Sequence, residues 1–224
     1  MRIPITKYGL PQVAIVPAVI LAAMAGVYAL GATAAVFWPV EAALLIVLLW
    51  AMWFFRDPQR KAPQDKNVLL SPADGTITDI EQVEPDEYFA HRAWRIGIFL
   101  SIFNVHINRA PCAVRVGRIR YRPGAFKNAM NPHCGRVNES NDVQMFRLEE
   151  PTDELLIRQI SGAIARRIVC AANSGDELDA GQRFGMIKFG SRTELFVPLR
   201  QNAELAVKIG DKVKAGLTIL ARYK

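Results

Sequence analysis

The sequence has 224 residues and a mass of 24.9 kDa, enough for one domain with an added segment. Its 28 basic and 21 acidic residues are unevenly distributed, because only Arg2, Lys7 and Glu41 precede Arg56. This distribution excludes both a wholly soluble protein and a polytopic transporter, and it predicts a membrane anchor (residues 1–61) followed by a globular domain (residues 62–224). The net charge of +7 suits anionic membrane lipids. Nucleic acid is excluded as a partner, because the basic residues form no patch interleaved with aromatic side chains.

The anchor is an apolar run from Pro11 to Phe55 that contains one charged residue. The run is about twice the roughly 20 residues that one helix needs to cross a bilayer. It predicts two helices with a turn between about Gly31 and Glu41. A second helix that began after Glu41 would be short, so a re-entrant or interfacial hairpin remains an alternative to a true crossing. Basic residues flank both ends of the run, which predicts that the globular domain lies on the cytoplasmic face of the cell membrane.

The three cysteines are far apart in the sequence: Cys112, Cys134 and Cys170. They form no CxxC pair and no cluster with histidine at metal-ligand spacing. We therefore expect neither a metal site nor a disulfide framework, and a reducing compartment is the simpler interpretation.

The globular domain consists of short apolar runs separated by Gly, Pro, Asn and Asp, which predicts a mainly β, multi-stranded fold. The expected strands are 68–70, 75–83, 94–100, 113–121, 143–148, 155–160, 165–169, 183–189, 193–197 and 218–221. One short helix is expected over Ile102–Asn108, and a long polar surface loop over Asn128–Asp142.

Two turns suggest the particular β architecture. The segments SPADG, which begins at Ser71, and GDKVKAG, which begins at Gly210, resemble the hairpins of lipoyl-like barrel-sandwich domains. Ordinary Asp-containing turns between strands are the alternative. Lys188 lacks the flanking methionines of a modifiable carrier lysine, so the resemblance is architectural. The expected fold is thus a lipoyl-like barrel-sandwich domain behind an α-helical membrane hairpin.

Each of the three histidines has a different context. His91 lies in a charged stretch and is expected at the surface, whereas His133 lies in the long polar loop and is accessible to a substrate. His106 follows an apolar segment in FLSIFNVHINRAP. A histidine in such a setting is either a hydrogen-bonded core residue or a buried catalytic group.

The chain has no nucleophile elbow, zinc-protease motif, phosphate-binding loop or dinucleotide fingerprint. Its single Gly-Ser dipeptide, Gly190–Ser191, lies between two expected strands and is either a plain turn or a reactive peptide. A serine hydroxyl can attack the preceding glycine carbonyl when the backbone is strained and a base is near. Ester formation and elimination would then cut the chain and leave Ser191 as a terminal pyruvoyl group, a ketone electrophilic toward a substrate amine.

Taken together, the segments SPADG, FNVHINRAP, the NES/ND loop, RFGMIKFGSRTELFVP and GDKVKAG, in this order behind an apolar N-terminus, resemble the short bacterial type of phosphatidylserine decarboxylase proenzyme. The resemblance covers essentially the whole chain. It implies a self-cleaving, pyruvoyl-dependent enzyme without a metal, which makes phosphatidylethanolamine and CO₂ from phosphatidylserine. Cleavage would give a β chain of residues 1–190 and an α chain of residues 191–224, associated as a heterodimer that can form a higher oligomer.

The same resemblance implies roles for individual residues. Ser191 is the nucleophile and pyruvoyl precursor, and Asp74 of SPADG is the acidic partner of the histidine that removes its proton. Longer relatives carry two histidines three residues apart, whereas this chain has His106 at the first position and Arg109 at the second. Either His106 serves both cleavage and decarboxylation, or the base for cleavage lies elsewhere, at His133 or at Asp74 through a water.

Four residues are implied in substrate binding: Asn108, Arg109, His133 and Asn138. Arg109 is expected either to hold the lipid phosphate or carboxylate or to have a structural role. Asn138, Glu139 and Asn141 match part of a family loop motif, but Ser140 stands where arginine is usual.

Two other functions remain open. One is the decarboxylation of another seryl lipid, such as archaetidylserine, by the same chemistry. The other is a non-enzymatic, membrane-anchored barrel-sandwich adaptor, although no heptad run for its usual coiled coil is present.

Overall fold

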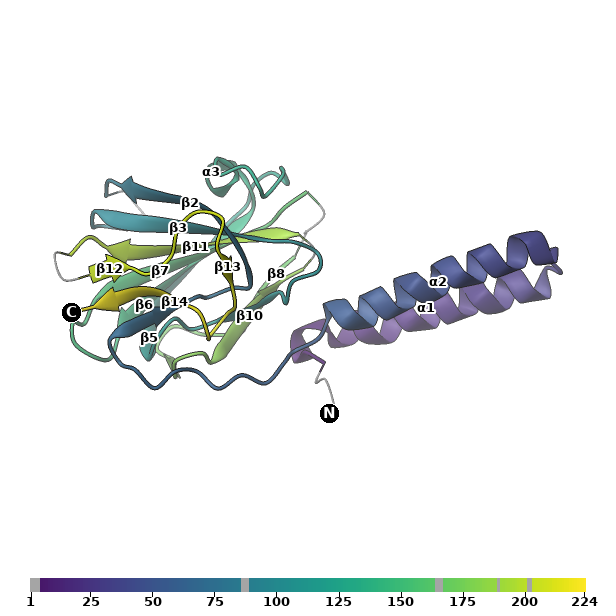
Figure 1. Cartoon of the computed structure of the whole chain (residues 1–224), viewed down its shortest axis with the longest axis horizontal. Helices are drawn as coiled ribbons and strands as arrows, with labels where there is room; N and C mark the ends of the chain where they lie inside the picture. Colours follow the sequence, from purple (N-terminus) through teal and green to yellow (C-terminus); the bar gives the residue numbers. More distant parts are fainter. Residues whose placement is uncertain (1–4, 86–88, 164–166, 189, 201–202) are drawn as a thin grey trace. The chain divides into compact units, whose positions relative to one another are not determined.

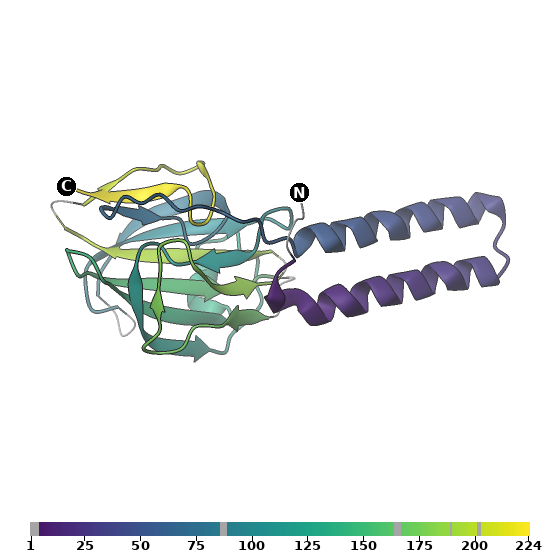
Figure 2. The ribbon, with the colours of Figure 1, turned by 90° about the horizontal axis from the view of Figure 1, so that it is seen from below.

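A computed structural model describes residues 5–85, 89–163, 167–188, 190–200 and 203–224. The chain divides into two compact units, Met1–Gln59 and Arg60–Lys224. The first unit is a helical hairpin, in which a short 3₁₀ helix (Lys7–Gly9) leads into α1 (Leu10–Ala29) and then α2 (Ala34–Phe54), with the two helices side by side (Figure 2). Both helices are long and apolar enough to cross a membrane.

The turn between the helices comes earlier than the sequence suggested. It ends at Thr33, whose extended backbone (φ −60°, ψ 151°) starts α2 at Ala34. Pro39 therefore lies inside α2 rather than before it. It lies in the second helical turn, where its missing amide removes one backbone hydrogen bond from the helix. The second helix has 21 residues, so it is not too short to span.

The second unit is built from antiparallel sheets (Figure 1). Its largest sheet is curled and has, among the described residues, the strand order β13-β2-β3-β11-β7-β6-β5-β9. In that order the strands are Lys212–Val213, Gly75–Val83, Ala93–Leu100, Ser191–Pro198, Glu154–Ile160, Ser140–Arg147, Val114–Arg122 and Glu177–Leu178. Two three-stranded sheets complete the unit: β1-β14-β12 (Val68–Leu70, Ile219–Tyr223, Ala203–Leu205) and β4-β10-β8 (Ile107–Arg109, Arg183–Ile187, Ile168–Cys170).

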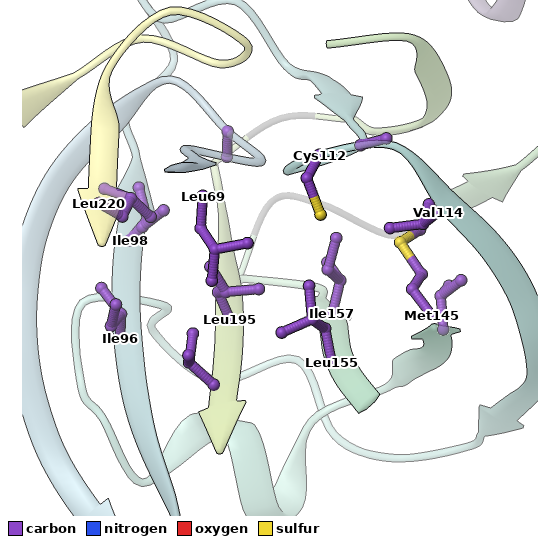
Figure 3. Close-up of a cluster of buried hydrophobic side chains, with 14 of the residues drawn as sticks. Leu69, Ile96, Ile98, Cys112, Val114, Met145, Leu155, Ile157, Leu195 and Leu220 are labelled. Atoms are coloured by element: carbon purple, nitrogen blue, oxygen red, sulfur yellow. The ribbon is translucent and has the colours of Figure 1, made fainter. Parts of the chain in front are cut away.

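One main core lies between the sheets, and its members are aliphatic side chains from nearly every strand (Figure 3). Leu195 of β11 packs there with Ile96 and Ile98 of β3 and with Ile157 of β7. The mainly β domain expected from the short apolar runs is thus confirmed, and the curled sheet agrees with a barrel-like sandwich.

The central strand β11 is buried along its whole length, on both faces of the sheet. Because side chains alternate along a strand, Leu195 and Val197 enter the core while Arg192 and Glu194 lie on the opposite face. Each of these two charged side chains is fully buried. The reactive Gly-Ser peptide predicted from the sequence therefore opens the most deeply buried strand of the domain.

One predicted element is wrong and one is incomplete. Residues Ile102–Asn108 form no helix; a turn closed by the Asn104 amide on the Ser101 carbonyl is followed by strand β4. The reason is tertiary pairing, since β4 bonds to β10 and overrides the local pattern. The polar loop over Asn128–Asp142 contains a short helix α3 (Cys134–Val137) and the start of β6. Among the described residues, four short strands were not predicted: β4, β9, β12 and β13. Two expected strands extend beyond the described residues, one at Phe189 and the other at residues 165–166.

Candidate active site

The Gly190–Ser191 peptide lies where β11 begins. Ser191 pairs with Leu100, the last residue of β3, and its side chain is fully buried. Within the described part of the chain, the Ser191 hydroxyl has no hydrogen-bond partner. Gly190 has φ +63°, a left-handed backbone conformation that residues other than glycine rarely adopt. An unpaired buried hydroxyl thus follows a glycine in a conformation that few residues tolerate, which is an arrangement that costs stability and calls for a functional reason.

His106 contacts this peptide directly. The Gly190 amide donates to Nε2 of His106 at 3.3 Å, and Nδ1 of the same ring lies 3.1 Å from the Asn104 carbonyl oxygen. An amide can only donate to an unprotonated ring nitrogen, so the proton is assigned to Nδ1, where it is donated to Asn104. The buried imidazole is thereby held in the tautomer that presents a basic Nε2 to the Gly-Ser peptide.

Gly162 makes room for the same peptide. A Cβ on Gly162 would collide with the carbonyl oxygen of Gly190 and touch the side chain of Ala129. The Gly190 carbonyl, which a serine nucleophile would attack, is therefore packed against a residue that must be glycine. The sequence offered no signal for Gly162, because it is one of 15 glycines and its neighbour Gly190 is 28 positions away.

Asp74 is buried and has two hydrogen-bond partners of its own. Its carboxylate accepts from Arg60 at 2.6 and 2.8 Å and from the Ala215 amide at 2.7 Å. Both carboxylate oxygens thus accept hydrogen bonds from Arg60, and one of them also accepts from the backbone of the turn before β14. The ring of His106, the partner that the resemblance implied for Asp74, is hydrogen-bonded to the Asn104 carbonyl.

Arg109 shares the surroundings of Asp74. Its Nη1 donates to the Gly181 carbonyl at 3.0 Å, and its side chain packs beside Gly216, next to the Ala215 amide that Asp74 accepts from. The side chain is 4% exposed. These contacts favour a structural role for Arg109 over binding of the lipid phosphate or carboxylate.

Asn108 and Asn138 are both buried and hydrogen-bonded within the fold. Asn108 donates to Thr193 (3.1 Å) and accepts from Gln159 (2.9 Å), which joins β4 to the central strands. Asn138 bonds the amide and carbonyl of Lys127 and the carbonyl of Ser161. Asn138 thereby holds the polar loop against Ser161, the residue before Gly162, and so supports the backbone that packs against the Gly190 carbonyl.

His133 and His91 are both exposed. His133 precedes α3, where its amide donates to the Asn131 side chain at 2.9 Å. His91 lies 3.4 Å from Glu154. Of the three histidines, the structure thus brings His106 to the Gly-Ser peptide.

A buried charge network, which the sequence analysis missed, begins one residue after Ser191. Arg192 bonds Asp79 and Glu194, and the network continues through Arg95 and through the pair of Arg158 with Asp142. Burial lowers the pKa of Arg192, but Glu194 and Asp79 outweigh it and raise the pKa overall, so the guanidinium is charged. The signal for this network was the alternation of charged and apolar residues in SRTELFVP. Because alternate side chains of a strand point to opposite faces, this pattern predicts that the charged residues share the face away from the core and bind partners there.

A second basic group lies just before the Gly-Ser peptide. Lys188 is buried, its amide donates to the Arg167 carbonyl at 3.1 Å, and burial, with the nearby Arg167 charge, lowers its pKa. In the sequence, basic residues thus flank the Gly-Ser peptide on both sides, and the charge of Arg192 is paired with Asp79 and Glu194.

A Gly-Ser peptide with a buried serine lies in contact with a histidine, in a β domain that follows two membrane-length helices, and this indicates a membrane-associated enzyme of the self-processing class. The sequence profile of the family described as phosphatidylserine decarboxylase matches residues 47–221. A phosphatidylserine decarboxylase proenzyme of Rhodopirellula baltica is 43% identical over 99% of this chain and 89% of its own length. Proenzymes of the same name from Carboxydothermus hydrogenoformans (41% identity; 81% of this chain, 83% of theirs) and Magnetococcus marinus (38%; 91% and 92%) are also similar.

The chain belongs to the phosphatidylserine decarboxylase family. It is a lyase of phospholipid biosynthesis that converts phosphatidylserine to phosphatidylethanolamine, as the resemblance of its motifs implied. Membership of this proenzyme family also implies a pyruvoyl cofactor and cleavage into two chains. The two apolar helices indicate association with a membrane.

Proposed function

We propose that the pyruvoyl group arises from Ser191, by cleavage of the chain between Gly190 and Ser191. The observation that carries this proposal is the hydrogen bond from the Gly190 amide to Nε2 of His106, beside a buried serine hydroxyl that is unpaired within the described residues. Ser191 Oγ attacks the Gly190 carbonyl carbon, so that the peptide C–N bond breaks and an ester C–O bond forms. Elimination then breaks the Ser191 Cβ–O bond, and hydrolysis of the resulting enamine releases ammonia and leaves the ketone.

His106 moves the protons of this reaction. Its unprotonated Nε2 takes the hydroxyl proton as Ser191 attacks, and it returns a proton to the Ser191 nitrogen as the C–N bond breaks. The Asn104 carbonyl holds the ring in place and stabilises the doubly protonated form in between. In this proposal Asp74 supports the site through Arg60 and the Ala215 turn.

His106 also serves decarboxylation. The pyruvoyl group supplies the electron sink for the bond that loses CO₂. His106 belongs to the β chain and lies beside the end of the α chain where this group would form, so it then protonates the substrate carbon. Asn108, Arg109 and Asn138 keep the surrounding loops and strands in register, whereas His133, exposed on the polar loop, is available to the lipid headgroup.

The two chains are expected to stay together after cleavage. The α chain, residues 191–224, contributes β11 to the centre of the large sheet, between β3 and β7 of the β chain, and β14 pairs with β1. Separating them would break four such pairings and expose the main core, so a tight heterodimer follows. We place the anchor in residues 1–61, the catalytic domain in residues 62–224, and this domain on the cytoplasmic face, because basic residues flank both ends of the hairpin.

The intact mass of the detergent-extracted protein tests the proposal. We expect two chains, the smaller beginning at position 191 with a blocked pyruvoyl end. Ser191→Ala and His106→Ala should each give one uncut, inactive chain. Ser140→Ala is the matched control, because Ser140 is another buried serine whose hydroxyl is unpaired within the described residues, yet it lies on β6 and should leave cleavage intact. Cleavage of the Ser191→Ala chain at the same bond would refute the assignment, and release of CO₂ from archaetidylserine but not from phosphatidylserine would reassign the substrate.

A further inference from the structure

Two loops of the catalytic domain converge on the Gly190 peptide. The turn Ser101–Asn104 follows β3, and its Ile102 side chain approaches the position that a Cβ on Gly190 would occupy, at 3.8 Å. The polar loop also approaches this peptide, where Ala129 packs against Gly162 beside the Gly190 carbonyl. Both contacts belong to the catalytic unit, so this convergence is a property of that unit alone.

Next to these inward-facing residues, each loop carries a large apolar side chain that faces solvent. Phe103 is 65% exposed and Met130 is 57% exposed, and Phe126 on the second loop is 39% exposed. Hydrogen bonds close the turns that carry Phe103 and Met130. The Asn104 side chain accepts from the Ser101 amide at 2.9 Å, and the Asn128 side chain accepts from the Met130 amide at 3.0 Å.

The charged residues of the two loops are all basic. The segments 101–109 and 123–137 contain no acidic residue, and Lys127 and Arg136 are exposed on the second. Exposed apolar side chains with interspersed basic ones are typical of surfaces that lie in the interface of an anionic bilayer. The substrate, phosphatidylserine, is itself an anionic lipid whose acyl chains remain in the bilayer.

We propose that Phe103, Phe126 and Met130 form an apolar rim that enters the headgroup layer of an anionic phospholipid bilayer and holds the reactive end of the catalytic domain at the lipid surface. This proposal rests on the proposed function in one respect, the placement of the reactive group at Gly190–Ser191. The helical hairpin keeps the enzyme on the membrane, and the rim sets the orientation of the catalytic domain there. Lys127 and Arg136 pair with lipid phosphates and carboxylates around it.

The rim is tested by comparing the activity of the enzyme on phosphatidylserine in a bilayer with its activity on dispersed phosphatidylserine. The full-length protein carrying Phe103→Ser and Met130→Ser is reconstituted in vesicles of phosphatidylserine and phosphatidylcholine, and it is separately assayed in detergent with a monomeric short-chain phosphatidylserine. We expect kcat/KM to fall about tenfold or more on the vesicles and to stay unchanged on the monomeric lipid, because two large apolar side chains no longer enter the bilayer. The pair Phe103→Leu and Met130→Leu should retain the vesicle activity.

Leu148→Ser is the control. Leu148 is 41% exposed and follows β6 at Arg147, the end opposite to Ser140, so this change should leave both activities as they were. Equal losses on both substrates, or no loss on vesicles, would overturn the rim. The mass of every variant is measured first, since a chain that is not cut at Gly190 contradicts the proposed function, whereas a fully cut chain with an unchanged ratio of the two activities contradicts the rim alone.

A spin label distinguishes the bilayer from a second copy of the chain as the occupant of the rim. Phe103→Cys and Leu148→Cys are labelled separately in the full-length protein with Cys170 replaced by serine. The label at position 103 should become accessible to membrane-dissolved oxygen in vesicles, and the label at position 148 should not. Broadening between labels on two copies, without access to oxygen, would contradict the proposal and indicate a dimer interface.

Discussion

Nη2 of Arg192 lies 2.7 and 2.6 Å from the two carboxylate oxygens of Asp79, one residue after the serine proposed to become the pyruvoyl group. Both side chains are buried, and Gly97 lacks the Cβ that would collide with this pair. Arg192 also donates to Thr78 and Glu194, so that its guanidinium joins β11 to β2. After cleavage, this arginine would be the first anchored side chain of the α chain and would fix the position of its new end.

Removing the arginine should therefore destabilise the domain strongly. Arg192→Met leaves Asp79 and Glu194 buried without their main partner, which we expect to lower the free energy of unfolding by about 3–5 kcal/mol. Thermal unfolding of the detergent-solubilised protein measures this. Adding Asp79→Asn to Arg192→Met should recover part of the loss, because one of the two stranded charges is gone. Two losses that simply add would show that the residues are not coupled.

Gly162 should be required for processing. Gly162→Ala places a Cβ where the Gly190 carbonyl oxygen lies, so the peptide must shift from its present position in contact with His106. We expect the uncut chain to accumulate, with cleavage slowed by about a hundredfold, as displacements of about 1 Å at a reacting group produce. Gel analysis of the two chains over time measures the rate. Gly26→Ala is the control, since a Cβ there meets no atom within 4 Å; processing of Gly162→Ala at the normal rate would contradict the close packing.

The orientation of His106 should depend on the turn that carries Asn104. The Asn104 side chain accepts from the Ser101 amide, and its own carbonyl accepts from the histidine ring. Asn104→Ala removes the first of these bonds, which is worth about 1 kcal/mol, so cleavage should slow about fivefold. Asn104→Asp keeps an acceptor oxygen and should process nearly normally. If both variants slow equally, the amide nitrogen of the Asn104 side chain, and not its oxygen, is what matters.

The sequence predicted the site and the fold to different depths. Gly190–Ser191, the single Gly-Ser dipeptide, and His106, a histidine after an apolar segment, each had an ordinary structural alternative, and the family resemblance implied their roles. The structure brings the two into contact. The orienting group was not found, because it is a backbone carbonyl, and a carbonyl has no signature in the sequence. Asp74 was assigned from the family resemblance, whereas its contacts with Arg60 and Ala215 join residues 14 and 141 positions away, which no local pattern indicates.

A similar limit applied to the secondary structure. Long strands such as β2 were predicted residue for residue, because their apolar pattern and flanking turns are strong. The short strands β4 and β13 were missed, since their neighbouring residues have no strand pattern and pairing with β10 and β2 forms them. The first of these is the strand after His106, so the helix predicted there misplaced the histidine until the pairing with β10 was known.

Asp74→Asn separates the two roles that can be given to this residue. The change leaves Arg60 buried without its carboxylate, so we expect a loss of about 3–5 kcal/mol in stability, with cleavage at Gly190 retained at low temperature. Arg60→Met, which breaks the same ion pair from the other side, should behave alike. Mass spectrometry and thermal unfolding give the two readouts. An uncut Asp74→Asn chain of normal stability would show instead that the carboxylate takes part in cleavage, as the family resemblance implied.

The cysteines should report whether the loop over the charge network stays closed. Burial raises the pKa of Cys134, in α3, to about 11 and that of Cys112 to about 12, whereas Cys170 is only half-buried. Because the thiolate is the reactive form, iodoacetamide at pH 8 should modify Cys170 first and the other two only after unfolding. Raising the pH toward 10 should speed labelling of accessible thiols about tenfold per unit below their pKa, but it should not expose the buried ones. Peptide mass spectrometry follows each site. Cys134 labelling as fast as Cys170 would show that α3 and its loop open in solution, uncovering Glu194, against which Gly135 packs.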